Sequence, residues 1–226
     1  MLSPLDNPVF TALVTGDRHL GGGNDRVRFF DADVSPFAGF RDGLEADFDE
    51  LHGLLPVGRS ILYACRGPLP AQHRWDLRHA ISGLQFLYDA NRVLAAPTVE
   101  PLPLDGRHVT DMMALAALTK PGPFAARTIE FGQYHGIFSE GMLVAMTGQR
   151  LHAGSYTEIS AVCTHPDHLG KGYAASLLNH QLAIILASGK QPFLHVRADN
   201  ARAIALYERL GFAVNGPMNF YFMKSL

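Results

Sequence analysis

The segment EISAVCTHPDHLGKGYAASLL, residues 158–178, carries the clearest information about the fold. Its first seven residues have the β-branched content of a strand, and Pro166 ends that strand because proline cannot donate to a ladder. Apolar residues then recur at helical spacing over residues 173–188. The glycines at 170 and 172 are therefore expected in a turn that joins a strand to a helix.

A turn of this kind can bind an anion. The first backbone amides of a helix have no helical partner, and the helix dipole places positive charge at the same end. Gly170 and Gly172 have no Cβ that would hold a phosphate away, and Lys171 adds a charge. Because short glycine patterns are weak evidence, an ordinary glycine-rich turn is the alternative.

Two other phosphate-binding motifs fit less well. The spacing of a P-loop, Gly-x-x-x-x-Gly-Lys-Ser/Thr, does not occur in the sequence. The Rossmann pattern is met by Gly170, Gly172 and Ala175, with Asp199 as a ribose acceptor. A Rossmann strand runs almost directly into its first glycine, however, whereas residues 165–169 intervene here. The context disfavours a dinucleotide site.

The rest of the second half alternates between strand and helix patterns. Strands are expected over 133–138, 142–151, 192–197, 212–214 and 220–223, and further helices over 109–118 and 201–210. Asp199 or Asn200 caps the last helix, and Gly211 ends it. The order α-β-β-β-α-β-α-β-β belongs to the α/β (α+β) class.

Three prolines within residues 97–103 mark a boundary, since neither a helix nor a central strand continues through them. We predict an N-terminal α/β region over residues 1–100 and a second domain over 101–226. In the first region strands are expected over 26–30, 60–65 and 80–88, and a helix over 37–54. No catalytic signature occurs there.

Composition limits the classes of partner. The 226 residues include 19 basic and 21 acidic ones without any Lys/Arg run, which argues against nucleic-acid binding. The beginning of the sequence lacks a basic secretory signal, and the apolar runs are too short to span a membrane. Cys65 and Cys163 are expected to be reduced thiols. We therefore expect a cytoplasmic protein without membrane contact.

Segment 158–178, followed by NARAIALYERLGF at residues 200–212, resembles the GCN5-related N-acetyltransferase (GNAT) superfamily and its FR47-like branch. The resemblance covers about residues 105–226. It implies a central, mixed, mostly antiparallel sheet with a splayed strand pair and flanking helices. It also implies acetyl-CoA as co-substrate. The length and strand-helix order of residues 1–100 would permit a degenerate GNAT-like half, but the sequence similarity between the two halves is too slight to identify one.

The resemblance further implies which residues bind acetyl-CoA. The free backbone of the splayed strand binds pantetheine, and the motif Arg/Gln-x-x-Gly-x-Gly/Ala binds the pyrophosphate. The implied set is Val162, Cys163, Thr164, Leu169, Gly170, Lys171, Gly172, Tyr173, Ala174 and Asn200. Leu169 departs from the motif because it replaces a polar side chain, and weaker cofactor affinity is expected.

Two residues receive catalytic roles from the resemblance. Tyr207 would protonate the departing CoA thiolate, since a phenol can donate a proton there; the alternative is a tyrosine of the core. Glu158 would remove the proton of the amine through water; the alternatives are a solvated strand end and a partner for a nearby arginine. Tyr156 and Glu130 are reserve candidates for the base.

Cys163, His165 and His168 have the spacing Cys-x-His-x-x-His, which suggests zinc. No fourth ligand has a matching spacing, and Pro166 redirects the chain before His168. We expect no metal. Cys163 is also not expected to carry the acyl group, because the family transfers it directly from CoA to the amine.

The sequence therefore predicts an N-acetyltransferase that moves an acetyl group from acetyl-CoA to a primary amine of a small molecule or peptide. The alternative is a non-catalytic acyl-CoA-binding sensor or interaction module with the same fold. The near-neutral net charge disfavours polybasic acceptors. The loops over 119–127, 149–156 and 215–219 would shape the acceptor site, and a homodimer remains open.

Overall fold

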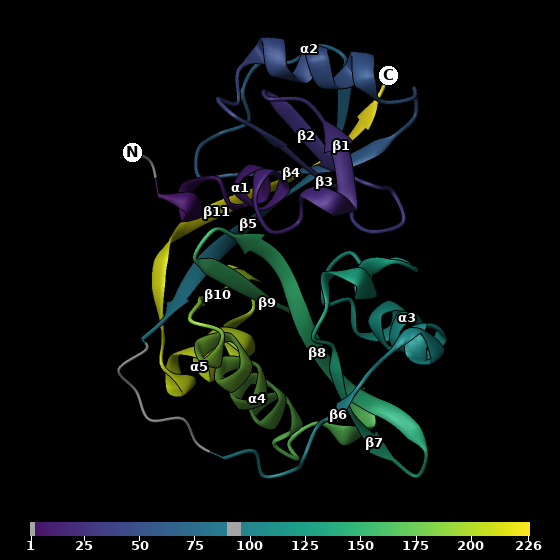
Figure 1. The fold of residues 1–226 in the computed structure, drawn as a ribbon, viewed down its shortest axis with the longest axis vertical. Helices are drawn as coiled ribbons and strands as arrows, with labels where there is room; N and C mark the ends of the chain where they lie inside the picture. The colour runs from purple at the N-terminus through teal and green to yellow at the C-terminus, as the bar shows by residue number, and fades with distance from the viewer. Residues whose placement is uncertain (1–2, 90–95) are drawn as a thin grey trace.

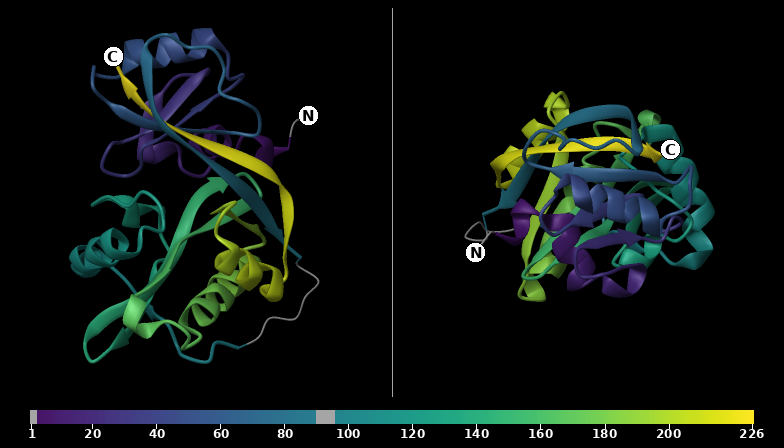
Figure 2. Two further views of the ribbon diagram at one scale, coloured as in Figure 1. Left: turned by 180° about the vertical axis from the view of Figure 1, so that it is seen from behind. Right: turned by 90° about the horizontal axis from the view of Figure 1, so that it is seen from above.

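Strand β5 (Trp75–Tyr88), from the first half of the chain, lies between two strands of the second half, β10 (Gln191–Arg197) and β11 (Phe212–Ser225). The computed structural model describes residues 3–89 and 96–226. In this part of the chain all strands join one sheet, in the order β1-β2-β3-β4-β11-β5-β10-β9-β8-β7-β6. Figures 1 and 2 show β5 and β11 running together from one half to the other.

The remaining elements are distributed over the two halves. The first half contributes α1 (Pro8–Val14), β1 (Gly21–Gly23), β2 (Val27–Phe30), β3 (Phe37–Phe40), α2 (Glu45–Leu54) and β4 (Ser60–Cys65). The second half contributes β6 (Leu102–Pro103), α3 (Val109–Thr119), β7 (His135–Ser139), β8 (Met142–Ala153), β9 (Tyr156–Thr164), α4 (Tyr173–Ala187) and α5 (Ala201–Leu210). The division at residue 100 stays a prediction, because the halves share a sheet.

Two strands diverge in the middle of this sheet. The parallel strands β9 and β10 pair only at their first residues, and the last pair is Glu158 with Phe193. Further along β9, Ala161 has a φ of 54°, and the register with β8 shifts beside it. This bulge bends β9. The mixed sheet with a splayed strand pair is therefore confirmed.

Separate apolar clusters cover the two faces of the sheet. Helices α4 and α5 pack on one face, around Ile159, Leu178 and Phe86. On the other face α1 and α3 pack against Leu151, Met146 and neighbouring residues of the largest cluster. The splay between β9 and β10 thus lies between two layers of packed side chains. Because the two strands are not paired beyond Glu158 and Phe193, a cavity can cross the sheet at this point.

Most of the predicted elements are present, with two corrections. The helix predicted over 37–54 begins only at Glu45, because residues 37–40 form the buried strand β3, where Gly39 packs against the backbone of Phe10. The strands predicted over 212–214 and 220–223 form one strand, β11, with a bulge between Val214 and Gly216. Helix α1 was not predicted.

Candidate active site

A cavity of about 840 Å³ opens where β9 and β10 diverge. Most of the residues predicted to bind acetyl-CoA or to act in catalysis line it: Val162, Cys163, Thr164, Leu169, Gly170, Gly172, Tyr173, Ala174, Asn200 and Tyr207. Lys171 and Glu158 are the predicted residues that do not. The two distant motifs therefore meet at one site.

The glycine turn forms one end of the cavity. Gly170 and Gly172 both have a φ of 80°, a left-handed conformation that favours glycine, and Gly172 is the N-cap of α4. Within the described residues no group accepts a hydrogen bond from the amides of residues 170–172. These amides, at the positive end of α4, suit the oxygens of a phosphate. Nζ of Lys171 lies 3.2 Å from Nδ1 of His168.

Tyr207, on α5, lines the cavity with its ring in the core. Its ring centroid lies 6.2 Å from that of Phe86 and 5.9 Å from that of Phe212. Its hydroxyl has no hydrogen-bond partner among the residues that the structure describes, and burial raises the pKa of the phenol to about 12. Tyr207 is thus a core residue that keeps a protonated hydroxyl available at the cavity.

Asn200 lies at the start of the same helix. Its Oδ1 accepts a hydrogen bond from the amide of Ala203 at 3.1 Å, so the predicted helix cap is confirmed. The cap uses the oxygen of the side-chain amide. Nδ2 remains as the donor that this residue can offer to a ligand in the cavity.

Glu158 is fully buried and holds an ion pair. Nε and Nη2 of Arg150 donate to its two carboxylate oxygens at 2.8 and 2.7 Å, and Nδ1 of His195 lies 2.7 Å from Oε1. Burial opposes ionisation, but Arg150 and His195 outweigh it and lower the pKa of Glu158 to about 2. The structure excludes a solvated strand end and shows the partner for an arginine. A carboxylate bound in this way is a weak base.

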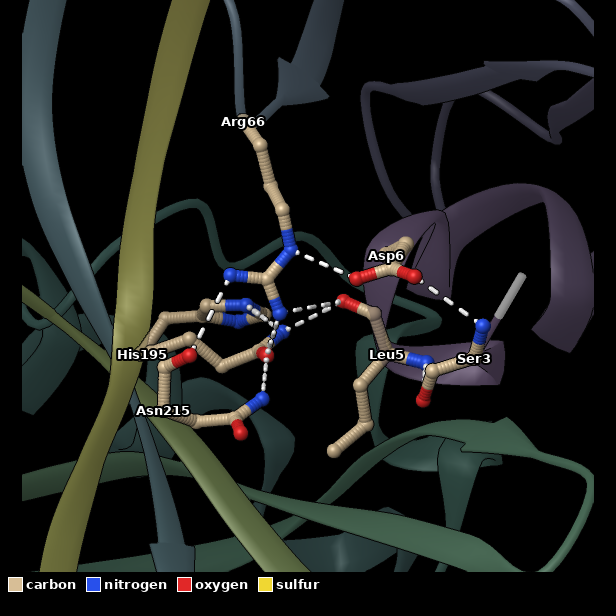
Figure 3. A network of polar contacts seen from close by, with 7 residues as sticks. Ser3, Leu5, Asp6, Arg66, His195 and Asn215 are labelled. Atoms are coloured by element: carbon tan, nitrogen blue, oxygen red, sulfur yellow. Dashed lines mark hydrogen bonds and ion pairs between the residues drawn. The ribbon is translucent and has the colours of Figure 1, made fainter.

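The ion pair is linked to the first half of the chain through His195. Nε2 of Gln85, on β5, donates to Nε2 of His195 at 3.0 Å and to the carbonyl of Leu5 at 3.0 Å. Oε1 of Gln85 accepts from Nη2 of Arg66 and from Nδ2 of Asn215. Figure 3 shows Leu5, Arg66, His195 and Asn215 gathered in this network. This network fixes the orientation of the His195 ring at the cavity wall.

Sequence reasoning did not identify Arg150 or His195. Arg150 stands opposite Glu158 in the β8–β9 register, and His195 is reached across the β9–β10 splay. A bulge between Arg150 and His152 hid the pairing, since counting from the hairpin turn would have placed Leu151 opposite Glu158. An arginine and a glutamate of opposite charge on adjacent predicted strands were the available signal.

The reserve candidates lie elsewhere. Glu130 pairs with Nε of Arg127 at 2.7 Å, and Tyr156 packs against the largest core cluster; neither lines the cavity.

Burial raises the pKa of Cys163 to about 11, so its thiol stays protonated. Within the described residues no group of three or more His, Cys, Asp or Glu side chains is arranged to hold a metal ion. No described helix is long and apolar enough to cross a membrane.

A protein of known structure shares this fold over its whole length. A GNAT-family protein from Novosphingobium aromaticivorans, solved by crystallography, is 31% identical to the chain; the match covers 100% of both chains with a TM-score of 0.90. The chain belongs to the GNAT acetyltransferase family. Within that family, the model of FR47-like proteins matches residues 134–221.

More distant GNAT proteins share the fold. A GCN5-related N-acetyltransferase from Kribbella flavida has a TM-score of 0.60 at 16% identity, over 97% of this chain and 95% of that one. A curated relative, spermidine N(1)-acetyltransferase of Vibrio cholerae, is 38% identical over 53 residues. That match spans 23% of this chain and 31% of the enzyme, less than a third of the relative's length.

Proposed function

We propose that the protein transfers an acetyl group from acetyl-CoA to a primary amine of a small molecule or peptide, by direct attack on the thioester. The observation that carries this proposal is the single cavity that joins the glycine turn of residues 170–172 to the hydroxyl of Tyr207. A phosphate site and a proton donor in one cavity are what transfer from a phosphate-bearing thioester requires.

Each part of the cavity has its own task. The backbone amides of residues 170–174 bind the pyrophosphate, with Lys171 nearby, and the diverging part of β9 at Val162, Cys163 and Thr164 binds pantetheine together with Asn200. Acetyl-CoA supplies the acetyl group on a thiolate leaving group. Tyr207 gives its proton to that thiolate, which makes the thiolate a better leaving group.

Ligand-dependent thermal unfolding tests donor binding. At a hundredfold excess over the dissociation constant, a ligand stabilises the native state by about 2.7 kcal/mol, which raises Tm by roughly 5 to 10 °C at this chain length. We expect this shift with acetyl-CoA and with CoA, and none with NADH. An unchanged Tm with both acetyl-CoA and CoA would refute acetyl-CoA as the donor.

Leu169 gives a second prediction about the donor site. This side chain is 45% exposed at the cavity, where the family motif has a polar residue. The substitution Leu169→Gln supplies a hydrogen-bonding side chain without moving the backbone, and we expect the Kd for acetyl-CoA to fall about threefold to tenfold, which one added hydrogen bond of this kind provides. Calorimetric titration measures the change.

The matched control for Leu169→Gln is Leu169→Met, which keeps an apolar side chain of similar volume and is expected to leave the Kd unchanged. Equal affinities of the two variants would show that the residue at position 169 does not contribute to acetyl-CoA binding, and that the backbone amides act alone.

The alternative function is an acyl-CoA-binding sensor or interaction module, favoured by Leu169. Release of the CoA thiol in the presence of amines separates the two functions, because only the enzyme turns over. Spermidine belongs in the amine panel, since the curated relative is named for it. Acetyl-CoA binding without thiol release from any amine would favour the sensor.

A further inference from the structure

The end of the cavity away from the glycine turn is lined by apolar side chains. Phe37 on β3, Leu62 on β4 and Ile81 on β5 come from the first half of the chain, and Phe220 and Phe222 come from β11. With the exception of Ile81, these residues belong to or pack against the core cluster on the face opposite α4 and α5. The cavity therefore passes through the splay and ends in an aromatic wall.

The charged side chains that line the cavity are basic, and two of them are held in ion pairs, Arg150 with Glu158 and Arg197 with Asp199. Among the described residues that line it there is no aspartate or glutamate, whereas Lys120, Arg150, Arg197, Arg202 and Arg209 all contribute to the lining. The carboxylate of Glu158 lies behind Arg150, with both oxygens occupied by hydrogen bonds. A ligand at the aromatic end thus meets the Arg150–Glu158 ion pair and apolar surface, and among the described lining residues no carboxylate is available to pair with a second ammonium group.

We propose that this aromatic end is the acceptor subsite, and that the acceptor is a monoamine carrying an aromatic or branched aliphatic group rather than a polyamine. The proposal rests on the proposed function, because it places the acceptor on the opposite side of the splay from the donor. It also gives the first half of the chain a role, because this half supplies Phe37, Leu62 and Ile81 to the wall that selects the substrate.

The apolar wall favours such a group by burying it. Ile81, Phe220 and Phe222 are partly exposed in the unliganded protein, so a ligand that covers them removes apolar surface from water. A single methylene group in an apolar pocket changes selectivity by about 10- to 200-fold. A phenyl ring should therefore be preferred strongly over a methyl group at this end.

The apolar lining without an available carboxylate acts against polyamines and suits a monoamine. A second ammonium group would be desolvated against apolar side chains without a carboxylate to pair with it, which is unfavourable. The same surroundings favour the neutral form of the reacting amine, and the neutral form is the one that attacks the thioester. The subsite can supply the reactive form without a free carboxylate in contact with the nitrogen.

The experiment measures kcat/KM for CoA-thiol release with 2-phenylethylamine, 3-methylbutylamine, ethylamine, putrescine and spermidine. We expect 2-phenylethylamine and 3-methylbutylamine to exceed ethylamine at least tenfold, and both polyamines to fall below ethylamine. A kcat/KM for spermidine equal to or above that for 2-phenylethylamine would overturn the proposal while leaving the proposed function intact.

Two variants of β5 locate the effect. Ile81→Ala should lower the ratio of kcat/KM for 2-phenylethylamine over ethylamine about tenfold, because Ile81 lines the aromatic end. Leu77→Ala on the same strand is the matched control, since Leu77 is exposed and does not line the cavity. Equal ratios in both variants would place the acceptor elsewhere.

A binding measurement keeps this inference separate from catalysis. In the presence of saturating CoA, 2-phenylethylamine should bind more tightly than ethylamine at least tenfold by calorimetry, and Ile81→Ala should remove most of this difference. If CoA binds but no amine is acetylated, the proposed function fails, and the same titration still decides the acceptor subsite. Binding of spermidine in preference to 2-phenylethylamine would refute it.

Discussion

Replacing Tyr207 by phenylalanine is expected to lower kcat about 100-fold or more while the Kd for acetyl-CoA changes by less than a few-fold. The ring of Tyr207 packs between Phe86 and Phe212, so phenylalanine fills the same volume. The lost hydroxyl is the proton donor for the departing thiolate, and general-acid catalysis contributes about 10²- to 10⁴-fold to rates. Because the hydroxyl acts in the transition state, kcat should fall more than the affinity.

Steady-state kinetics of thiol release and calorimetry measure these two quantities. The matched control is Tyr221→Phe, which removes a hydroxyl that donates to the carbonyl of Gly67 outside the cavity and should leave kcat unchanged. An unaltered kcat in Tyr207→Phe would leave this tyrosine with only its packing role in the core.

The second large effect concerns stability. In Glu158→Gln the guanidinium of Arg150 stays buried without a carboxylate, and removing one partner of a buried pair costs about 3 to 5 kcal/mol. At 2 to 4 °C per kcal/mol for a chain of this size, Tm should fall by roughly 6 to 20 °C. Glu208→Gln, at an exposed position on α5, should stay within about 0.5 kcal/mol of the wild type.

The pH dependence of stability gives an independent readout of the same pair. Because the native-state pKa of Glu158 is lowered to about 2 from 4.5, the stability it contributes is present above pH 4.5 and is lost as the pH falls toward 2. Urea unfolding of the wild type should show this loss, and Glu158→Gln should show less of it. Parallel curves for the two proteins would contradict the assigned ion pair.

Glu158→Gln also tests the predicted role as a base. A carboxylate with a pKa of about 2 stays ionised and holds protons weakly, so we expect the kcat/KM of the folded variant to keep its dependence on pH above 5. Disappearance of that dependence would assign the base to Glu158 after all, with Arg150 and His195 as its positioning partners.

The motif region was predictable because its signals are local. Each of its features depends on residues that are close together in the sequence. These features are the strand that ends before Pro166, the glycine turn and the cap at Asn200. Most of the donor-site residues predicted from these signals line one cavity.

The features that the sequence did not predict depend on pairing between distant segments. The ion pair of Arg150 and Glu158 needs the bulged β8–β9 register, and its link to His195 and Gln85 needs β10 and β5 side by side. The aromatic end draws on four strands from both halves. The error over residues 37–40 has a related cause, since β3 is stabilised by α1 and the neighbouring strands rather than by its own residue pattern.

The interlocked strand order delays completion of the sheet while the chain is synthesised on the ribosome. Strands β4 and β5 follow each other along the chain, yet β11 separates them in the sheet, and β11 is the last described strand to be synthesised. At a translation rate of about 5 to 20 residues per second, the edges of β4 and β5 wait of the order of 10 s for their partner. Unpaired edges of this length invite aggregation. A molecular chaperone that shields the nascent first half would serve this chain more than a protein whose halves fold in turn.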